Sequence, residues 1–104
     1  MIWLLLACGS AADRPDSCAD QPVVTWESFG HGFMTSYCVS CHSTYNTTNR
    51  YGAPENVNFD TEADTLHWKA RIQQRVLEEQ TMPLGGGVYP QDLYLLGVYL
   101  GCGE

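Results

Sequence analysis

Cysteine and histidine side chains stand together in the stretch "YCVSCHS", residues 37–43 of this 104-residue sequence. Cys38 and Cys41 are separated by two residues, and His42 follows the second cysteine directly. Three kinds of chemistry use such a stretch: thiol–disulfide exchange, zinc binding and covalent attachment of a haem. The rest of the sequence has to distinguish among them.

The first two alternatives lack their usual context. A C-x-x-C redox centre usually lies beside a βαβ pattern, and this sequence has no strand pattern. A structural zinc site needs four ligands, typically from two separated pairs, and only one C-x-x-C is present. Zinc bound by Cys38 and Cys41 would need further ligands from Cys18, Cys102 or a distant histidine. A structural zinc or interaction module therefore stays as an alternative function.

The sequence C-x-x-C-H is the attachment signature of c-type haem. Two thiols at this spacing in a helical turn can reach the two vinyl groups at one porphyrin edge. His42 can then present an imidazole nitrogen to the iron, and Met82 would complete a His/Met ligand pair. Met82 lies in a loop, because "TMPLGGGVYP" at 81–90 is rich in glycine and proline. His67 is the main competitor of Met82 for this sixth position.

The elements that would position these residues are helical by pattern. A first helix is expected over 26–37, directly before the cysteines, with Thr25 as its cap. A second helical stretch over 61–80, with Thr61 as its cap, is apolar on two sides. One side is lined by Ala63, Leu66, Ala70 and Leu77 and the other by Trp68, Ile72 and Val76, which favours a break near His67. Pro90 suits the first turn of a last helix, 90–101. We therefore predict an all-α fold of three to five helices, whose long loops wrap around one central group.

From about Val23 to Cys102 the chain resembles small bacterial cytochromes c that carry the attachment motif near the N-terminus. "MP" after a helix, here Met82 and Pro83, is the common context of the sixth ligand in that family. The resemblance implies a cytochrome c-like fold around one covalently bound haem c. It also implies that the N-terminal and C-terminal helices cross.

The resemblance extends to the expected helix crossing. The first helix of the family has a glycine eight residues before the first haem cysteine and a bulky residue four before it. Gly30 and Met34 stand at these places. The family usually has an aromatic ring where Met34 stands, and here Phe33 lies beside it. On the last helix, the expected partner is Tyr99, or Gly97 by allowing close approach.

The N-terminal residues indicate export. Residues 1–7, "MIWLLLA", are apolar, and "LLAC" resembles a bacterial lipobox, which implies a lipid on Cys8 and attachment to a membrane. No basic residue precedes the run, so it is either a signal truncated at its start or merely an apolar tail. We divide the chain into this segment, a tether at 8–22 and a cytochrome c domain at 23–104. The expected location is the periplasm or cell envelope.

The five cysteines can all be accounted for under this interpretation. Haem uses Cys38 and Cys41, and a lipid uses Cys8. Cys18 and Cys102 remain, and in an oxidising compartment they are expected to form a disulfide. This bond would pin the N-terminal arm to the end of the last helix.

Charge narrows the expected partners. The net charge is −7, and the five Lys and Arg residues form no run, which argues against nucleic acid. We expect an electron-transfer protein that exchanges single electrons with redox proteins of the envelope. An enzyme is not expected, because His42 and Met82 together would leave no open position on the iron. If Met82 does not bind, the alternative is a haem sensor or a peroxidase-like protein.

Overall fold

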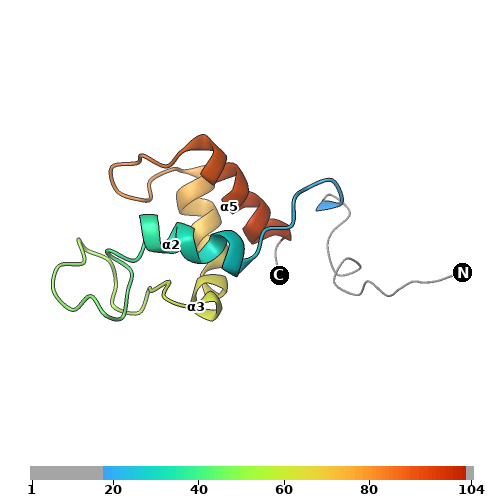
Figure 1. Ribbon diagram of the computed structural model, residues 1–104. Coiled ribbons are helices and arrows are strands. Elements are labelled where there is room, and N and C mark those ends of the chain that lie inside the picture. The colour runs from blue at the N-terminus through green and yellow to red at the C-terminus, as the bar shows by residue number, and fades with distance from the viewer. Residues whose placement is uncertain (1–17, 103–104) are drawn as a thin grey trace, which may run out of the picture.

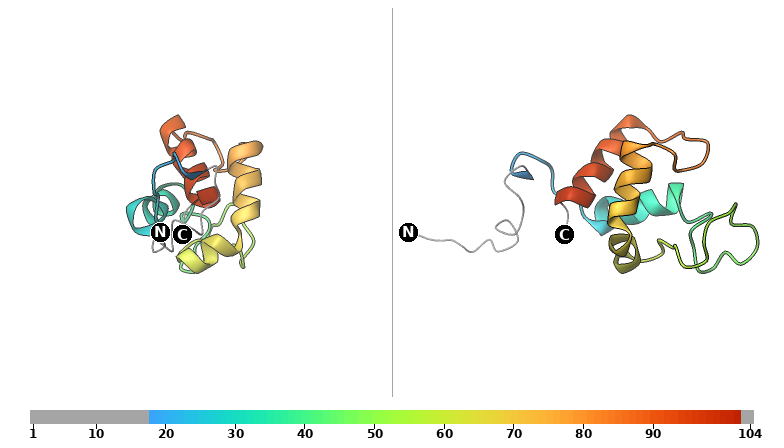
Figure 2. Two further views of the ribbon diagram at one scale, coloured as in Figure 1. Left: turned by 90° about the vertical axis from the view of Figure 1, so that its right-hand side faces the viewer. Right: turned by 180° about the vertical axis from the view of Figure 1, so that it is seen from behind.

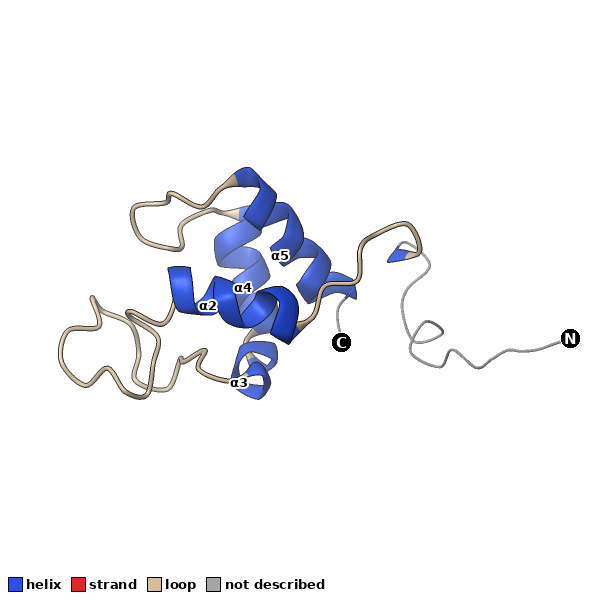
Figure 3. Cartoon of the chain, in the orientation of Figure 1, coloured by secondary structure: helices blue, strands red, loops and turns tan. Residues whose placement is uncertain are grey.

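The computed structural model describes residues 18–102, so the predicted signal segment and the lipid site at Cys8 lie outside the described residues. The helical elements, in chain order, are η3 (Trp26–Gly30, a π-helix), α2 (His31–Tyr37), α3 (Glu62–His67), α4 (Lys69–Ile72), η4 (Gln73–Glu78, a π-helix) and α5 (Pro90–Cys102). None of the described residues lies in a strand, which confirms the all-α prediction (Figure 3). No helix in this part of the chain is long and apolar enough to cross a bilayer.

The first helix begins where the sequence predicted. The Thr25 hydroxyl accepts a hydrogen bond from the Ser28 backbone N–H at 3.0 Å, and the Ser28 hydroxyl accepts one from the Thr25 N–H at 3.0 Å. This reciprocal capping box satisfies two of the N–H groups that a helix start leaves without partners. η3 then continues into α2, which ends directly before Cys38.

The second helical stretch is interrupted, as predicted, next to His67. Thr61 caps α3 by accepting from the Asp64 N–H at 3.1 Å, and Trp68 separates α3 from α4. Ile72 and Val76 are buried after the break, in agreement with one predicted apolar side. The other predicted side is partly wrong, because two of its alanines, at 63 and 70, are exposed. The break turns α3 so that it buries Thr65 instead.

The helices pack around α5, which contacts both η3 and η4. Figures 1 and 2 show the two long loops, 43–58 and 81–89, extending from the same side of this helical core. The N-terminal arm joins the opposite end of α5 (Figure 1). The buried apolar core consists of Val24, Phe33, Met34, Phe59, Ile72, Val76, Leu96, Val98, Tyr99 and Leu100.

Gly30 lies where η3 packs against α5. A Cβ atom built on Gly30 would stand 3.1 Å from Cζ of Tyr99 and 2.9 Å from Cε3 of Trp26. Tyr99 is therefore the helix-crossing partner of Gly30, as one of the two predicted candidates. Gly97, the other candidate, faces Leu77 instead, with 3.7 Å to Cδ1.

Two tyrosine–carboxylate hydrogen bonds tie α5 to the other helices. Tyr99 donates to Glu62 Oε2 at 2.7 Å, which links α5 to the first turn of α3. Tyr37 donates to Asp92 Oδ2 at 2.9 Å, which links the end of α2 to the first turn of α5. Burial, followed by the bond to Glu62, raises the pKa of the Tyr99 phenol, so this hydroxyl remains a donor over the ordinary pH range.

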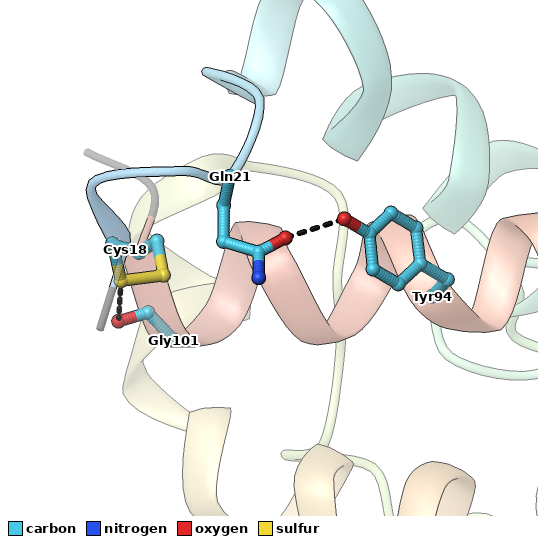
Figure 4. The surroundings of a disulfide bond; sticks show 5 residues. Cys18, Gln21, Tyr94 and Gly101 are labelled. Carbon is cyan, nitrogen blue, oxygen red and sulfur yellow. Dashed lines mark hydrogen bonds between the residues drawn. A yellow bond between two sulfur atoms is a disulfide. The ribbon is translucent and has the colours of Figure 1, made fainter.

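The N-terminal arm is fixed to α5 by a disulfide. Cys18 and Cys102 form this bond, with their Cα atoms 5.7 Å apart and Cys18 buried (Figure 4). The Tyr94 hydroxyl also donates to the Gln21 side chain, about two helical turns along α5 (Figure 4). The arm therefore lies along α5 from Cys102 to Tyr94.

Candidate functional site

A cavity of about 560 Å³ opens between the turn after α2, the 43–58 loop, the α4–η4 helix and the start of the 81–89 loop. Its volume lies in the range of small-molecule and cofactor sites, roughly 300–1,000 Å³. The predicted site residues Cys38, Cys41, His42 and Met82 all line it. The other lining residues are Tyr37, Arg50, Tyr51, Gly52, Ala53, Pro54, Asn56, Val57, Phe59, Trp68, Arg71, Ile72, Arg75, Val76, Pro83 and Leu84.

The end of α2 positions the two cysteines. The Cys38 N–H donates to the Met34 carbonyl at 2.9 Å, which extends the last helical turn. The Cys41 and His42 N–H groups then both donate to the Cys38 carbonyl, at 3.2 and 2.9 Å. This tight turn is why residues 38, 41 and 42 reach the same cavity.

His42 is held in one orientation. Its Nδ1 lies 2.9 Å from the Val57 carbonyl oxygen, and its ring centroid lies 4.9 Å from that of Phe59. A carbonyl can only accept, so Nδ1 carries the proton in this hydrogen bond. Nε2 is left with its lone pair, which is the form of imidazole that binds a metal.

Met82 lines the cavity from the loop that follows η4, far along the sequence from Cys38. The N–H groups of Thr81 and Met82 both donate to the Arg75 carbonyl, at 2.8 and 3.1 Å, so the end of η4 anchors this loop. Residues 85–87 then have φ values of 83, 70 and 87°, in the left-handed region that glycine tolerates best. The "GGG" sequence thus supplies the bend that returns the chain to α5.

The Cys38 thiol is not set up for disulfide exchange. Burial, followed by the neighbouring Cys41, raises the pKa of the Cys38 thiol to about 12. Exchange requires a thiolate, and reactive C-x-x-C centres have lowered thiol pKa values. Cys38 is therefore a neutral thiol at pH 7, so the redox-dithiol alternative gains no support from the site.

Arg50 organises the 43–58 loop around its guanidinium group. It donates to the backbone carbonyls of Pro54 and Val57 at 2.8 and 3.1 Å, and to Asn58 Oδ1 at 2.8 Å. It also donates to the carbonyls of Ser43, Asn46 and Ala53. A loop of this length has few apolar contacts. The charge-assisted hydrogen bonds from Arg50 hold it in its conformation instead.

Asp60 fixes the backbone immediately after His42. Its carboxylate accepts from the Ser43 hydroxyl at 2.6 Å and from the Thr44 N–H and hydroxyl at 2.8 and 3.1 Å. Burial acts to raise the pKa of Asp60, but these hydrogen bonds and the charge of Arg50 outweigh it, and the pKa is lowered.

Replacement of Asp60 with asparagine should therefore lower the free energy of unfolding by about 1 kcal/mol near pH 7. A hydrogen bond to a charged group usually stabilises a fold by somewhat more than this. Asp60 is only partly buried, and its exposure to solvent reduces the contribution. The lowered pKa means that the stabilisation is present above the ordinary value of 3.8 and is lost as the pH falls through the lowered one. Urea unfolding at several pH values measures this, and a difference that stays constant through the acid range would contradict it.

The cavity gathers cations in an acidic protein. Three of the chain's five Lys and Arg residues, Arg50, Arg71 and Arg75, line it, and none of its lining residues within 18–102 is acidic. Arg71 and Arg75 share one side of the α4–η4 helix, four residues apart. The lining otherwise is mainly apolar. Such a site suits a flat apolar ligand with anionic groups at its edge.

Some sequence candidates do not reach the cavity. His67 does not line it, and its ring packs edge-on against Trp68 at 4.9 Å. Trp68 itself lines the cavity, whereas Trp26 lies at the helix crossing. The sequence interpretation missed Arg75 and Phe59. The four-residue spacing of Arg71 and Arg75 was the signal that could have identified the former.

Two further findings concern metal-binding groups and the similarity of the chain to known proteins. Within residues 18–102, no three His, Cys, Asp or Glu side chains come together as a metal-binding group. In comparisons with known protein families, curated proteins and solved structures, the chain has no significant match. Any statement about function therefore depends on the geometry of the cavity.

Proposed function

We propose that this chain is a monohaem c-type cytochrome that carries single electrons in the bacterial cell envelope. The observation that carries the proposal is the convergence of Cys38, Cys41, His42 and Met82 on one cavity. The first three come from the turn after α2, and Met82 comes from a loop on the far side of two other helices. No local constraint of the sequence brings these two segments together.

The cavity fits a haem in its chemistry. Val57, Phe59, Ile72 and Val76 supply apolar surface for the porphyrin ring, and the guanidinium groups suit its two propionates. The thiols of Cys38 and Cys41 can each add S–H across one vinyl double bond, which forms a thioether with no leaving group and no oxidant. Once bound, the haem supplies an iron that takes up and releases one electron.

The protein itself supplies the two residues that would bind the iron. His42 offers Nε2 because its Nδ1–H is bound to the Val57 carbonyl. Met82 offers a thioether sulfur, and His/Met ligation favours the reduced state relative to two nitrogen ligands. If His42 and Met82 both bound the iron, no position on it would remain for a substrate. This supports electron transfer over a sensor or an enzyme.

The finer fold belongs to the same proposal. In a cytochrome c-like arrangement, the helix before the attachment motif crosses the last helix, and the sixth ligand lies in the loop before that last helix. The contact of Gly30 with Tyr99 and the position of Met82 support this arrangement. The Cys18–Cys102 disulfide supports an oxidising compartment such as the periplasm, as an exported protein requires. Lipid attachment at Cys8 remains part of the proposal.

The decisive experiment is to produce the chain together with a bacterial haem-attachment system. We expect a coloured protein whose mass is increased by one haem, and the haem should stay attached after denaturation. The double variant Cys38→Ala/Cys41→Ala, which preserves the helices, should lose this adduct. A colourless wild-type protein without the adduct would end the proposal, and elemental analysis for zinc would then test the structural alternative.

The ligand assignment has its own test. Met82→Ala should convert a low-spin visible spectrum into a high-spin one and lower the reduction potential, because the sixth ligand is removed. His67→Ala is the matched control and should leave the spectrum unchanged. A spectrum that responds to His67→Ala and not to Met82→Ala would reverse the assignment while retaining the haem.

A further inference from the structure

One backbone carbonyl serves two side chains of the site. The Val57 oxygen lies 2.9 Å from His42 Nδ1 and 3.1 Å from an Nη2 atom of Arg50. A carbonyl oxygen has two lone pairs, so both donors can be bound at once. The Val57 carbonyl therefore orients the imidazole of His42 and also accepts a hydrogen bond from the positively charged guanidinium group of Arg50.

The guanidinium group is fixed in this place. The same Nη2 atom of Arg50 lies 2.8 Å from both Asn58 Oδ1 and the Pro54 carbonyl oxygen, so its two N–H groups are shared among three acceptors. Asn58 is buried and donates to the Glu55 carbonyl at 2.9 Å. Within residues 18–102, no carboxylate lies within ion-pair distance of Arg50. Its hydrogen bonds therefore all go to neutral carbonyl and amide oxygens, the Val57 carbonyl among them.

The positive charge of Arg50 beside the Val57 oxygen affects the hydrogen bond that His42 makes to the same oxygen. It withdraws electron density from the carbonyl, so the hydrogen bond from the His42 Nδ1–H becomes weaker. A weaker second-shell acceptor makes the imidazole a poorer electron donor at Nε2. Both this effect and the nearby positive charge disfavour the oxidised form of a bound iron.

We propose that Arg50 is a positioning residue that tunes His42 through the Val57 carbonyl and so raises the reduction potential of the site. The inference rests on the proposed function, because it assigns His42 as an iron ligand. It goes further by naming the residue that sets the strength of that ligand. Arg50 itself touches neither the iron nor the Nε2 atom in this account.

The test compares two variants that each remove one cation from the lining of the same cavity. Arg50→Gln loses the charge on the Val57 carbonyl, whereas Arg71→Gln loses a charge with no bond to that carbonyl. The readouts are the reduction midpoint and the proton NMR shift of the His42 Nδ1–H in the reduced haem-loaded protein. Arg50→Gln should lower the midpoint and move the Nδ1–H resonance downfield, as its hydrogen bond strengthens. Arg71→Gln should leave that resonance in place.

A milder variant covers the case in which Arg50→Gln fails to fold. Asn58→Asp keeps the side-chain shape and gives the guanidinium a carboxylate partner, so both readouts should shift in the same directions by a smaller amount. Folded, haem-loaded variants with an unmoved Nδ1–H resonance would overturn this inference alone. Equal shifts of the resonance in Arg50→Gln and Arg71→Gln would overturn it as well. A wild-type protein without haem would overturn the proposed function, and this inference with it.

Discussion

Replacement of Cys18 and Cys102 with alanine should lower the free energy of unfolding by about 2–5 kcal/mol, the usual cost of losing a native disulfide in a small exported domain. The two cysteines are 84 residues apart, so the bond closes almost the whole described chain into one loop. Loop-closure entropy for this length corresponds to about 4–5 kcal/mol. The effect is large compared with the total stability of a small domain, about 5–15 kcal/mol.

Urea unfolding of the haem-loaded double variant measures this loss. The wild-type protein under reducing conditions should give nearly the same midpoint as the double variant, since both lack the bond. Tyr94→Phe is a matched control at the same junction, because it removes only the hydrogen bond to Gln21, and should cost about 1 kcal/mol or less. Equal midpoints for wild type and double variant would mean that the arm is not pinned in this way.

Gly30→Ala should lower the free energy of unfolding by about 1–3 kcal/mol, the typical cost of overpacking a core. The new methyl group would meet Trp26 Cε3 at 2.9 Å and the ring of Tyr99 at 3.1 and 3.2 Å. The Tyr99 ring cannot move freely. Tyr99 is almost fully buried, and its hydroxyl is held by Glu62.

Gly32→Ala provides the matched control, two residues along in α2. A Cβ atom at Gly32 meets no atom within 4 Å, and the residue is exposed. Alanine favours a helix over glycine by about 1 kcal/mol, so this variant should be as stable as the wild type or more stable. Thermal unfolding followed by circular dichroism compares the two. Similar stabilities for Gly30→Ala and Gly32→Ala would contradict a close helix crossing at Gly30.

Local sequence signals predicted the helices well. Thr25 and Thr61 cap where expected, the break falls at Trp68, and Pro90 begins α5. Each of these features depends on residues within one or two turns of one another. The alanines at 63 and 70 were placed wrongly, because the side of α3 that becomes buried depends on the angle of the break, which local pattern does not determine.

The side chains of the candidate site could be predicted from the sequence, but the backbone groups that hold them could not. Cysteine, histidine and methionine are recognisable in a sequence, and the structure brings Cys38, Cys41, His42 and Met82 to one cavity. The Val57 carbonyl is a group that every residue has, so nothing in the sequence marks it as the partner of His42. The charge and hydrogen-bonding type of Arg50 make it a candidate partner for a propionate, but its six acceptors come from the folded path of the loop. Whether a haem is bound remains a prediction.

The disulfide also has a mechanical consequence. The arm is joined to α5 at Cys18, so tension on it is transmitted through the covalent bond to the end of α5 at Cys102. The two loops that line the cavity extend from the other side of the helical core (Figure 1). A pull on the arm therefore loads the end of α5 directly through a covalent bond, on the side of the core away from the loop of Met82. The disulfide makes the arm and α5 one mechanical unit.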